Sequence, residues 1–179
     1  HLIAALLILA RNERGLTVHE EVDLATVAED VLDTAALGDR RVHQTLEPAV
    51  IAGDPVLAER LIANLVDNAV KFVPEGGKVD IELIHSDDSA IVRVTDSGSG
   101  ISEQEREVVL RRFYRSEKMR STPGVGLGLN LVAAIVKLHG FRLAIHAGPG
   151  GRVEIICPDP RPSSIGLDTR TQASVIDKP

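Results

Sequence analysis

The sequence is poor in aromatic residues. Its 179 residues include no tryptophan, one tyrosine and three phenylalanines. Single-stranded nucleic acids bind largely by stacking their bases on aromatic side chains, and phosphate backbones require a basic surface, whereas the formal net charge here is −6. We therefore expect no nucleic-acid partner. The core must be aliphatic, and a hydrophobic content of 44% is ordinary for a globular domain.

The sequence also lacks cysteine pairs and long apolar runs. Its one cysteine, Cys157, excludes an internal disulfide, and we expect it to be a small buried hydrophobic residue at the end of a strand. The longest apolar run, Leu2–Ala10, is far shorter than the roughly 20 residues that cross a bilayer. The sequence therefore predicts no membrane segment in this chain.

Hydrophobic periodicity divides the chain into three parts. Residues 1–15 predict the end of a helix that belongs to a preceding domain, and residues 159–179, rich in proline and serine, predict a disordered tail. Residues 16–158 predict an α+β two-layer sandwich, with a mixed sheet and helices on one face. The predicted helices cover residues 23–37, 54–73, 102–111 and 127–139, and the predicted strands lie near 17–22, 42–46, 49–52, 79–83, 92–95, 141–146 and 152–156.

Two asparagines and a lysine share one face of the predicted helix over residues 54–73. Asn64, Asn68 and Lys71 are spaced by four and three residues, opposite the apolar stripe of Leu61 and Leu65. A single such asparagine is usually a satisfied buried amide or a cap. Two in register beside a lysine favour a site for Mg²⁺ and phosphate, because a carboxamide oxygen binds the cation without adding negative charge.

An aspartate followed by alternating glycines comes directly after a predicted strand. In Asp96-Ser97-Gly98-Ser99-Gly100 the glycines allow a sharp turn beneath a flat ligand, and the carboxylate can accept a hydrogen bond from an adenine amine. Alone, this pattern is more often a plain turn. It is not a dinucleotide-binding fingerprint, and the chain has no P-loop.

Three further glycines, Gly124, Gly126 and Gly128, open the predicted helix over residues 127–139. Backbone amides in the first turn of a helix bind anions such as phosphates. The preceding residues, about 112–124, lack hydrophobic periodicity, which predicts a mobile loop. Its basic side chains would supply charge to a triphosphate, and Phe113 and Tyr114 would anchor its base; the basic residues are Arg112, Arg115, Lys118 and Arg120.

These motifs together resemble the catalytic domain of bacterial two-component sensor histidine kinases. Residues 64–72, Asn-Leu-Val-Asp-Asn-Ala-Val-Lys-Phe, resemble the N box of that family, and 96–100 its first glycine box. Phe113 corresponds to the F box and 124–129 to the second glycine box. The resemblance covers about residues 17–158. It implies the Bergerat (GHKL) ATP-binding fold, with a mixed, mostly antiparallel sheet, helices on one face and a mobile ATP lid.

The resemblance also implies a role for each matching residue. Asn68 would be the chief Mg²⁺ ligand with Asn64 assisting, Lys71 would touch phosphate, Phe72 would line the adenine pocket and Asp96 would bind the adenine amine. The implied catalytic residues are Asn64, Asn68 and Lys71. The remaining implied ATP-binding residues are Gly98, Gly100, Ile101, Phe113, Arg115, Gly124, Gly126, Leu127, Gly128 and Leu129.

The residue at position 64 bears on the reaction. Gyrase-like members of the fold carry a glutamate there that activates water, and an asparagine cannot act as that base. The resemblance therefore implies phosphoryl transfer rather than hydrolysis. The acceptor histidine of the family lies on an earlier helix, and His1-Leu2-Ile3 does not match its pattern.

The resemblance further implies partners and a location. The acceptor would lie on a dimerisation domain of the same protein, in a homodimeric parent that passes phosphate to a cognate response regulator. This chain would be a cytoplasmic domain of a parent anchored in the inner membrane.

Two alternatives remain open at the level of the sequence. A serine kinase of the anti-sigma-factor type shares the fold, but would lack the dimerisation helix suggested by Leu2–Ala10. A pseudokinase module would act through protein contacts, although intact Asn68, Asp96 and glycines argue against it.

Overall fold

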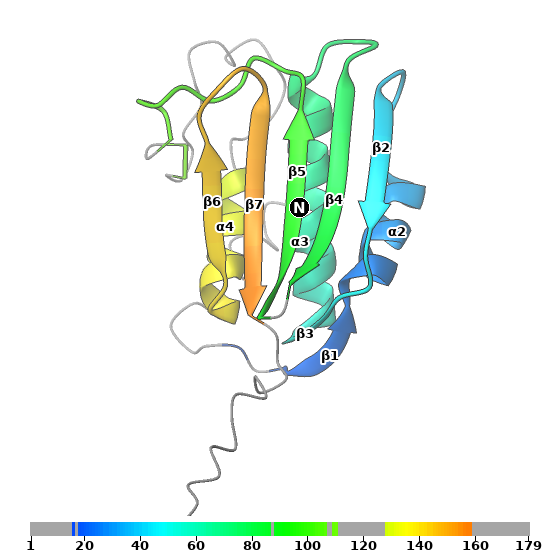
Figure 1. Cartoon of the computed structure of the whole chain (residues 1–179), viewed down its shortest axis with the longest axis vertical. Coiled ribbons are helices and arrows are strands. Elements are labelled where there is room, and N and C mark those ends of the chain that lie inside the picture. The colour runs from blue at the N-terminus through cyan, green and yellow to red at the C-terminus, as the bar shows by residue number, and fades with distance from the viewer. Residues whose placement is uncertain (1–15, 17, 87, 107–108, 111–127, 159–179) are drawn as a thin grey trace, which may run out of the picture.

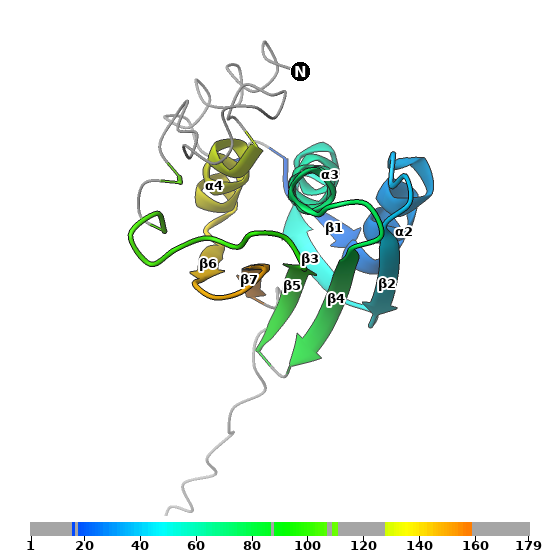
Figure 2. The same ribbon diagram turned by 90° about the horizontal axis from the view of Figure 1, so that it is seen from above.

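The computed structural model describes residues 16, 18–86, 88–106, 109–110 and 128–158, which form two layers. Helices α2 (Leu24–Thr34), α3 (Pro55–Phe72) and α4 (Gly128–His139) lie on one face of a five-stranded sheet, as Figures 1 and 2 show. The predicted helix end over residues 1–15, the loop over 112–124 and the tail over 159–179 lie outside the described residues.

The five-stranded sheet is mixed and mostly antiparallel. Its spatial order is β2 (Arg41–Leu46), β4 (Lys78–Ser86), β5 (Ser89–Asp96), β7 (Gly151–Pro158), β6 (Arg142–His146). Only β2 and β4 run parallel, because β3 and α3 form the long crossover between them. The predicted α+β sandwich is therefore confirmed.

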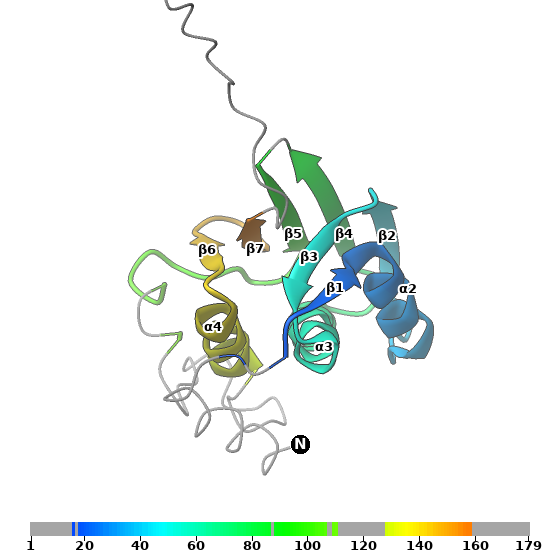
Figure 3. The same cartoon turned by 90° about the horizontal axis from the view of Figure 1, so that it is seen from below.

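A second, two-stranded sheet lies beside α2 and α3 (Figure 3). Strand β1 (Glu20–Asp23) pairs antiparallel with β3 (Val50–Gly53), and the register partners Val22 and Ile51 are buried. The sequence predicts both strands, but the predicted first strand begins at residue 17, three residues before the observed start of β1. The sequence does not predict that these two strands form a sheet of their own, because the pattern of a strand specifies its buried face but not the strand with which it pairs.

Aspartates begin two of the helices, as the sequence predicts. Asp23 Oδ1 accepts a hydrogen bond from the backbone amide of Ala25 at 3.0 Å, and Asp54 Oδ1 accepts one from Val56 at 2.9 Å. Helix α2 ends at Thr34 rather than Leu37, since Ala35 already has an extended backbone.

Within the described part of the chain, no helix is both long and apolar enough to cross a bilayer.

The predicted helix from Ser102 to Arg111 is wrong for the residues described there. Residues 103–106 and 109–110 form turns instead. The capping pair does form, because the carboxylate of Glu105 accepts from the backbone amide of Ser102 at 3.3 Å and from Ser102 Oγ at 2.7 Å. The amide of Val109 donates to the carbonyl of Glu105 at 2.8 Å. A capping signal therefore starts the turn here without extending it into a regular helix.

Helix α3 is the centre of the helical layer. Leu61 and Leu65 are buried as predicted. Because α3 packs against the sheet, α2 and α4, its buried stripe also includes Ile62 and Val66, while Leu57 and Phe72 are half-buried. From the sheet, Val79, Ile81, Leu83, Val92, Val94, Ile155 and Cys157 are buried. Burial raises the pKa of the Cys157 thiol to about 12, which agrees with its predicted structural role.

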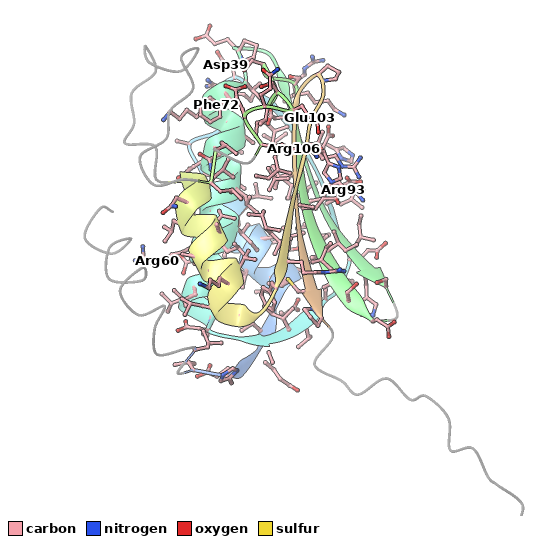
Figure 4. All side chains as sticks on the ribbon, turned by 90° about the vertical axis from the view of Figure 1, so that its left-hand side faces the viewer. Asp39, Arg60, Phe72, Arg93, Glu103 and Arg106 are labelled. Carbon is pink, nitrogen blue, oxygen red and sulfur yellow. The ribbon has the colours of Figure 1, made fainter. Side chains whose placement is uncertain are left out.

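Charged side chains cover the face of the sheet opposite the helices, where Figure 4 shows Arg93. The buried carboxylate of Glu154 on β7 accepts hydrogen bonds from Arg93 at 2.6 Å, Arg152 at 2.6 Å and His146 at 3.0 Å. Burial alone would raise the pKa of Glu154, but the three donors outweigh burial and lower it to about 2. This cluster joins β5, β6 and β7 across the outer face.

A histidine joins the end of α4 to the start of α3. His139 Nδ1 donates to the carbonyl of Ile135 at 2.9 Å, and Nε2 accepts the backbone amide of Asp54 at 3.1 Å. This pattern requires the neutral ring. Burial lowers the pKa of His139, although the bond to Ile135 and the charge of Asp54 favour the protonated form, while nearby His19 disfavours it.

We predict that acid weakens the fold through His139. Because the imidazole of His139 binds a proton less readily in the folded chain than in the unfolded chain, the free energy of unfolding should fall as the pH drops from ~7.5 to ~5.5. Urea unfolding followed by circular dichroism across this range checks it. His139→Gln, which does not titrate, should show a shallower dependence on pH; identical slopes in both proteins would contradict the assignment.

Candidate nucleotide site

The polar face of α3 carries the two asparagines. Asn64 Nδ2 donates to the carbonyl of Arg60, one turn earlier, at 2.7 Å. This bond fixes the carboxamide against the helix and uses the nitrogen, so Oδ1 is the atom left to act as a ligand. Asn64 and Asn68 are both half-buried, one turn apart on α3.

Asn68 lies against the first residue of α4. A Cβ atom added to Gly128 would lie 2.5 Å from Asn68 Oδ1 and 2.7 Å from Nδ2, so any other residue at position 128 would displace this carboxamide from its observed position. Nδ2 is buried and has no hydrogen-bond partner among the described residues. The structure therefore brings Gly128, the described glycine of the second glycine motif, onto the helix that carries the asparagines, and Nδ2 of Asn68 has unused hydrogen-bonding capacity among the described residues.

Lys71 and Phe72 complete the end of α3. The ammonium nitrogen of Lys71 lies 5.6 Å from the centre of the Phe72 ring, within the range of a cation–π contact. Figure 4 shows Phe72 at this end of α3. The predicted phosphate ligand and the predicted adenine-pocket residue are thus neighbours in space.

The carboxylate of Asp96 is held by two backbone amides. Its Oδ1 accepts from Gly98 at 2.8 Å and from Gly151 at 3.2 Å, and Oδ2 accepts no hydrogen bond from the described residues. A Cβ atom on Gly151 would overlap Oδ2. Asp96 is therefore oriented by one oxygen, and the other is available to accept from a ligand amine.

Close backbone contacts explain the glycines after Asp96. A Cβ atom on Gly98 would overlap the carbonyl oxygen of Phe72, and one on Gly100 would overlap the carbonyl oxygen of Gly148. Gly100 also has a positive φ of 68°. Residues 97–101 thus run between the end of α3 and the turn that joins β6 to β7, and half-buried Ile101 comes next to Gly100.

The structure brings together only some of the residues that the sequence predicts to bind ATP and Mg²⁺. Asn68 and Gly128 are in contact, Phe72 and Asp96 both lie against Gly98, and Leu129 is half-buried in the first turn of α4. Asn64 is not in hydrogen-bonding contact with Asp96 in the described part of the chain. The other predicted ligands lie outside the described residues; they are Phe113, Arg115, Gly124, Gly126 and Leu127.

Sequence reasoning missed Gly151. The Gly-Pro-Gly-Gly run at 148–151 predicts only a hairpin turn, although Gly151 both donates to Asp96 and leaves space for it. The unusual density of glycine was the available signal. Its partner could not be identified from the sequence, because 55 residues separate Gly151 from Asp96.

Comparisons with known proteins agree with this geometry. The family described as histidine kinase-, DNA gyrase B- and HSP90-like ATPases matches residues 53–161. The signal transduction histidine-protein kinase/phosphatase MprB of Mycobacterium ulcerans is 41% identical over 155 residues, which cover 84% of this chain and 30% of that protein. This chain therefore spans about a third of the length of the curated relatives it matches.

Solved structures show the same fold. The mycobacterial sensor histidine kinase MprB superimposes with a TM-score of 0.72 at 36% identity, over 79% of this chain and 97% of that one. The ATP-binding domain of PrrB from Mycobacterium tuberculosis gives a TM-score of 0.61 at 29% identity, over 80% and 98% of the two chains.

We predict that Gly151→Ala disrupts ATP binding. The added methyl group would displace the Asp96 carboxylate, and a lost hydrogen bond to a charged group weakens binding by about tenfold or more. Isothermal titration with ATP measures this effect. Ser99→Ala, an exposed change in the adjoining loop, is the control; equal affinities in both variants would show that Asp96 is not a ligand.

Proposed function

The chain belongs to the family of histidine kinase-, DNA gyrase B- and HSP90-like ATPases, and we propose that it transfers the γ-phosphate of ATP to a histidine on a dimerisation domain of the same protein. It is the catalytic, ATP-binding domain of a sensor histidine kinase. The observation that carries the proposal is the packing of Gly128 on Asn68, which joins the N box to the second glycine box.

The adenine end of the site is assigned to Asp96. Its Oδ2 would accept the exocyclic amine of adenine, and Oδ1 stays bound to the amides of Gly98 and Gly151. The adenine ring would pack beside Phe72, and the bare backbone at Gly98 and Gly100 would leave space for it. This arrangement supports an adenine ligand, because Oδ1 fixes the orientation of the carboxylate and Oδ2 keeps its full capacity to accept from an amine.

The phosphate end is assigned to α3. Asn68 and Asn64 would hold Mg²⁺ through their carboxamide oxygens, and Lys71 would contact phosphate. The remaining oxygen of Asn64 supports this assignment, since neutral oxygen ligands suit a cation that also binds phosphate. The buried Nδ2 of Asn68 has no partner among the described residues, so it can donate to a phosphate oxygen. Mg²⁺ would neutralise charge on the phosphates.

The chemistry of residue 64 favours transfer over hydrolysis. A carboxamide does not accept a proton at neutral pH, so Asn64 cannot activate a water molecule. Its nitrogen is moreover bonded to Arg60. The chain would therefore act by orienting ATP beside its acceptor rather than by supplying a base.

Two of this chain's histidines are already engaged elsewhere. Both ring nitrogens of His139 are bonded within the fold, and His146 is bonded to Glu154 on the outer face of the sheet. These bonds argue against His139 and His146 as phosphate acceptors. We further propose that the parent protein is a homodimer anchored in the inner membrane, with this domain in the cytoplasm, and that it passes phosphate to a cognate response regulator.

A nucleotide titration with and without metal tests the two ends of the site. We expect wild-type ATP affinity in the micromolar to millimolar range typical of substrates. Asp96→Ala should weaken binding about tenfold to a hundredfold with either Mg²⁺ or EDTA present, because it removes an acceptor for adenine. Asn68→Ala should weaken binding only with Mg²⁺. Thermal melting of each variant controls for unfolding, and wild-type affinity in both variants would refute the site.

Phosphoryl transfer is tested with a separately supplied dimerisation domain of the parent protein. The chain alone should hydrolyse ATP very slowly, and the mixture should label the added domain through a bond that is acid-labile and base-stable, as expected of phosphohistidine. Asn68→Ala should abolish the label. An acid-stable label on serine would instead favour a serine kinase of the anti-sigma-factor type.

A further inference from the structure

One buried polar side chain in α4 has no assigned role. Asn130 is 9% exposed and stands beside Leu131 and Val132, which are also buried. Its Nδ2 donates to the carbonyl of Leu110 at 2.8 Å, a contact between residues twenty apart in sequence. Its Oδ1 is buried and has no partner among the described residues.

The partner of Asn130 ends a run of turn hydrogen bonds that starts next to the first glycine motif. The amide of Arg106 donates to the carbonyl of Ser102 at 3.1 Å, and the amide of Val109 donates to Glu105 at 2.8 Å. Leu110 is the next residue. Asn130 thus connects the chain that leaves Gly100 and Ile101 to the first turn of α4.

The other end of this connection is the nucleotide site. Gly128 lies two residues before Asn130 in the same turn of α4, and it packs on the Asn68 carboxamide without space for a side chain. A small rotation or shift of this turn would change the contact between Gly128 and Asn68. Holding the turn to Leu110 therefore holds the position of Gly128 over Asn68.

The Oδ1 of Asn130, which has no partner in the part of the chain that the structure describes, argues against a role that only fills space. A buried acceptor without a partner destabilises a fold, and leucine has nearly the same shape without that penalty. If the position only filled space among apolar neighbours, leucine would serve at least as well. The amide nitrogen is the group that distinguishes asparagine here.

We propose that Asn130 is a positioning residue for ATP binding, which acts through its hydrogen bond to Leu110 and the resulting placement of Gly128 over Asn68. The identity of the ligand rests on the proposed function. The hydrogen bond and its effect on the first turn of α4 stand on the geometry alone, so the two can be tested separately.

The test compares Asn130→Leu with the wild-type chain. We expect an unchanged or higher melting temperature, and an affinity for ATP with Mg²⁺ that is roughly fivefold to tenfold weaker, which corresponds to one lost hydrogen bond. Asn130→Gln, which keeps an amide donor, should recover part of the affinity. Lys137→Ala, an exposed change in the last turn of α4, is the control and should bind as the wild type does.

Amide hydrogen exchange without nucleotide tests the connection itself. The amide of Val109 and those in the first turn of α4 should exchange faster in Asn130→Leu than in the wild type. Unchanged exchange, or wild-type ATP affinity in Asn130→Leu, overturns the proposal. A parallel loss of melting temperature and affinity also overturns it, because the role would then be structural. If the wild-type chain binds no ATP, the proposed function fails, and exchange still decides whether Asn130 holds the turn.

Discussion

The contact between Gly128 and Asn68 is the constraint on which the site depends. It places the first turn of α4 directly against the Asn68 carboxamide, and a side chain at position 128 would displace that carboxamide. Two hydrogen bonds, one at each end of α4, support this contact. His139 ties the far end of α4 to the start of α3, and Asn130 ties the near end to Leu110. The helical layer is thus held at both ends of α4.

The sheet holds the adenine end of the site in a different way. Asp96 is the last residue of β5, and Gly151, the first of β7, is its register partner. The pairing of these two strands therefore places the amide of Gly151 within hydrogen-bonding distance of the Asp96 carboxylate. On the outer face, Glu154 binds Arg93 and Arg152 and so joins the same strands. The glycine-lined inner site with the Asp96 carboxylate and the charged outer face are two sides of one pair of strands.

Most of the fold could be predicted from local signals. Asp23 and Asp54 begin helices because a carboxylate caps free amides wherever it stands, and alternating Val79, Ile81 and Leu83 indicate a buried face irrespective of neighbours. The sequence predicts a helix at the turn from Ser102 because a capping signal marks where a helix can start but not how far it extends. The separate ribbon of β1 and β3 could not be predicted, because strand pairing joins residues that are distant in sequence.

The sequence by itself determined the kind of site: two carboxamides in helical register, an aspartate at the end of a strand, and glycines at a helix start, with no base at Asn64. These features depend only on local spacing and on side-chain chemistry. Tertiary structure alone decided that Gly128 covers Asn68, that Gly151 shares the carboxylate of Asp96, and that Asn130 bonds Leu110. Each of these is a close contact across 20 to 60 residues, fixed by how helices and strands pack, which no local pattern encodes.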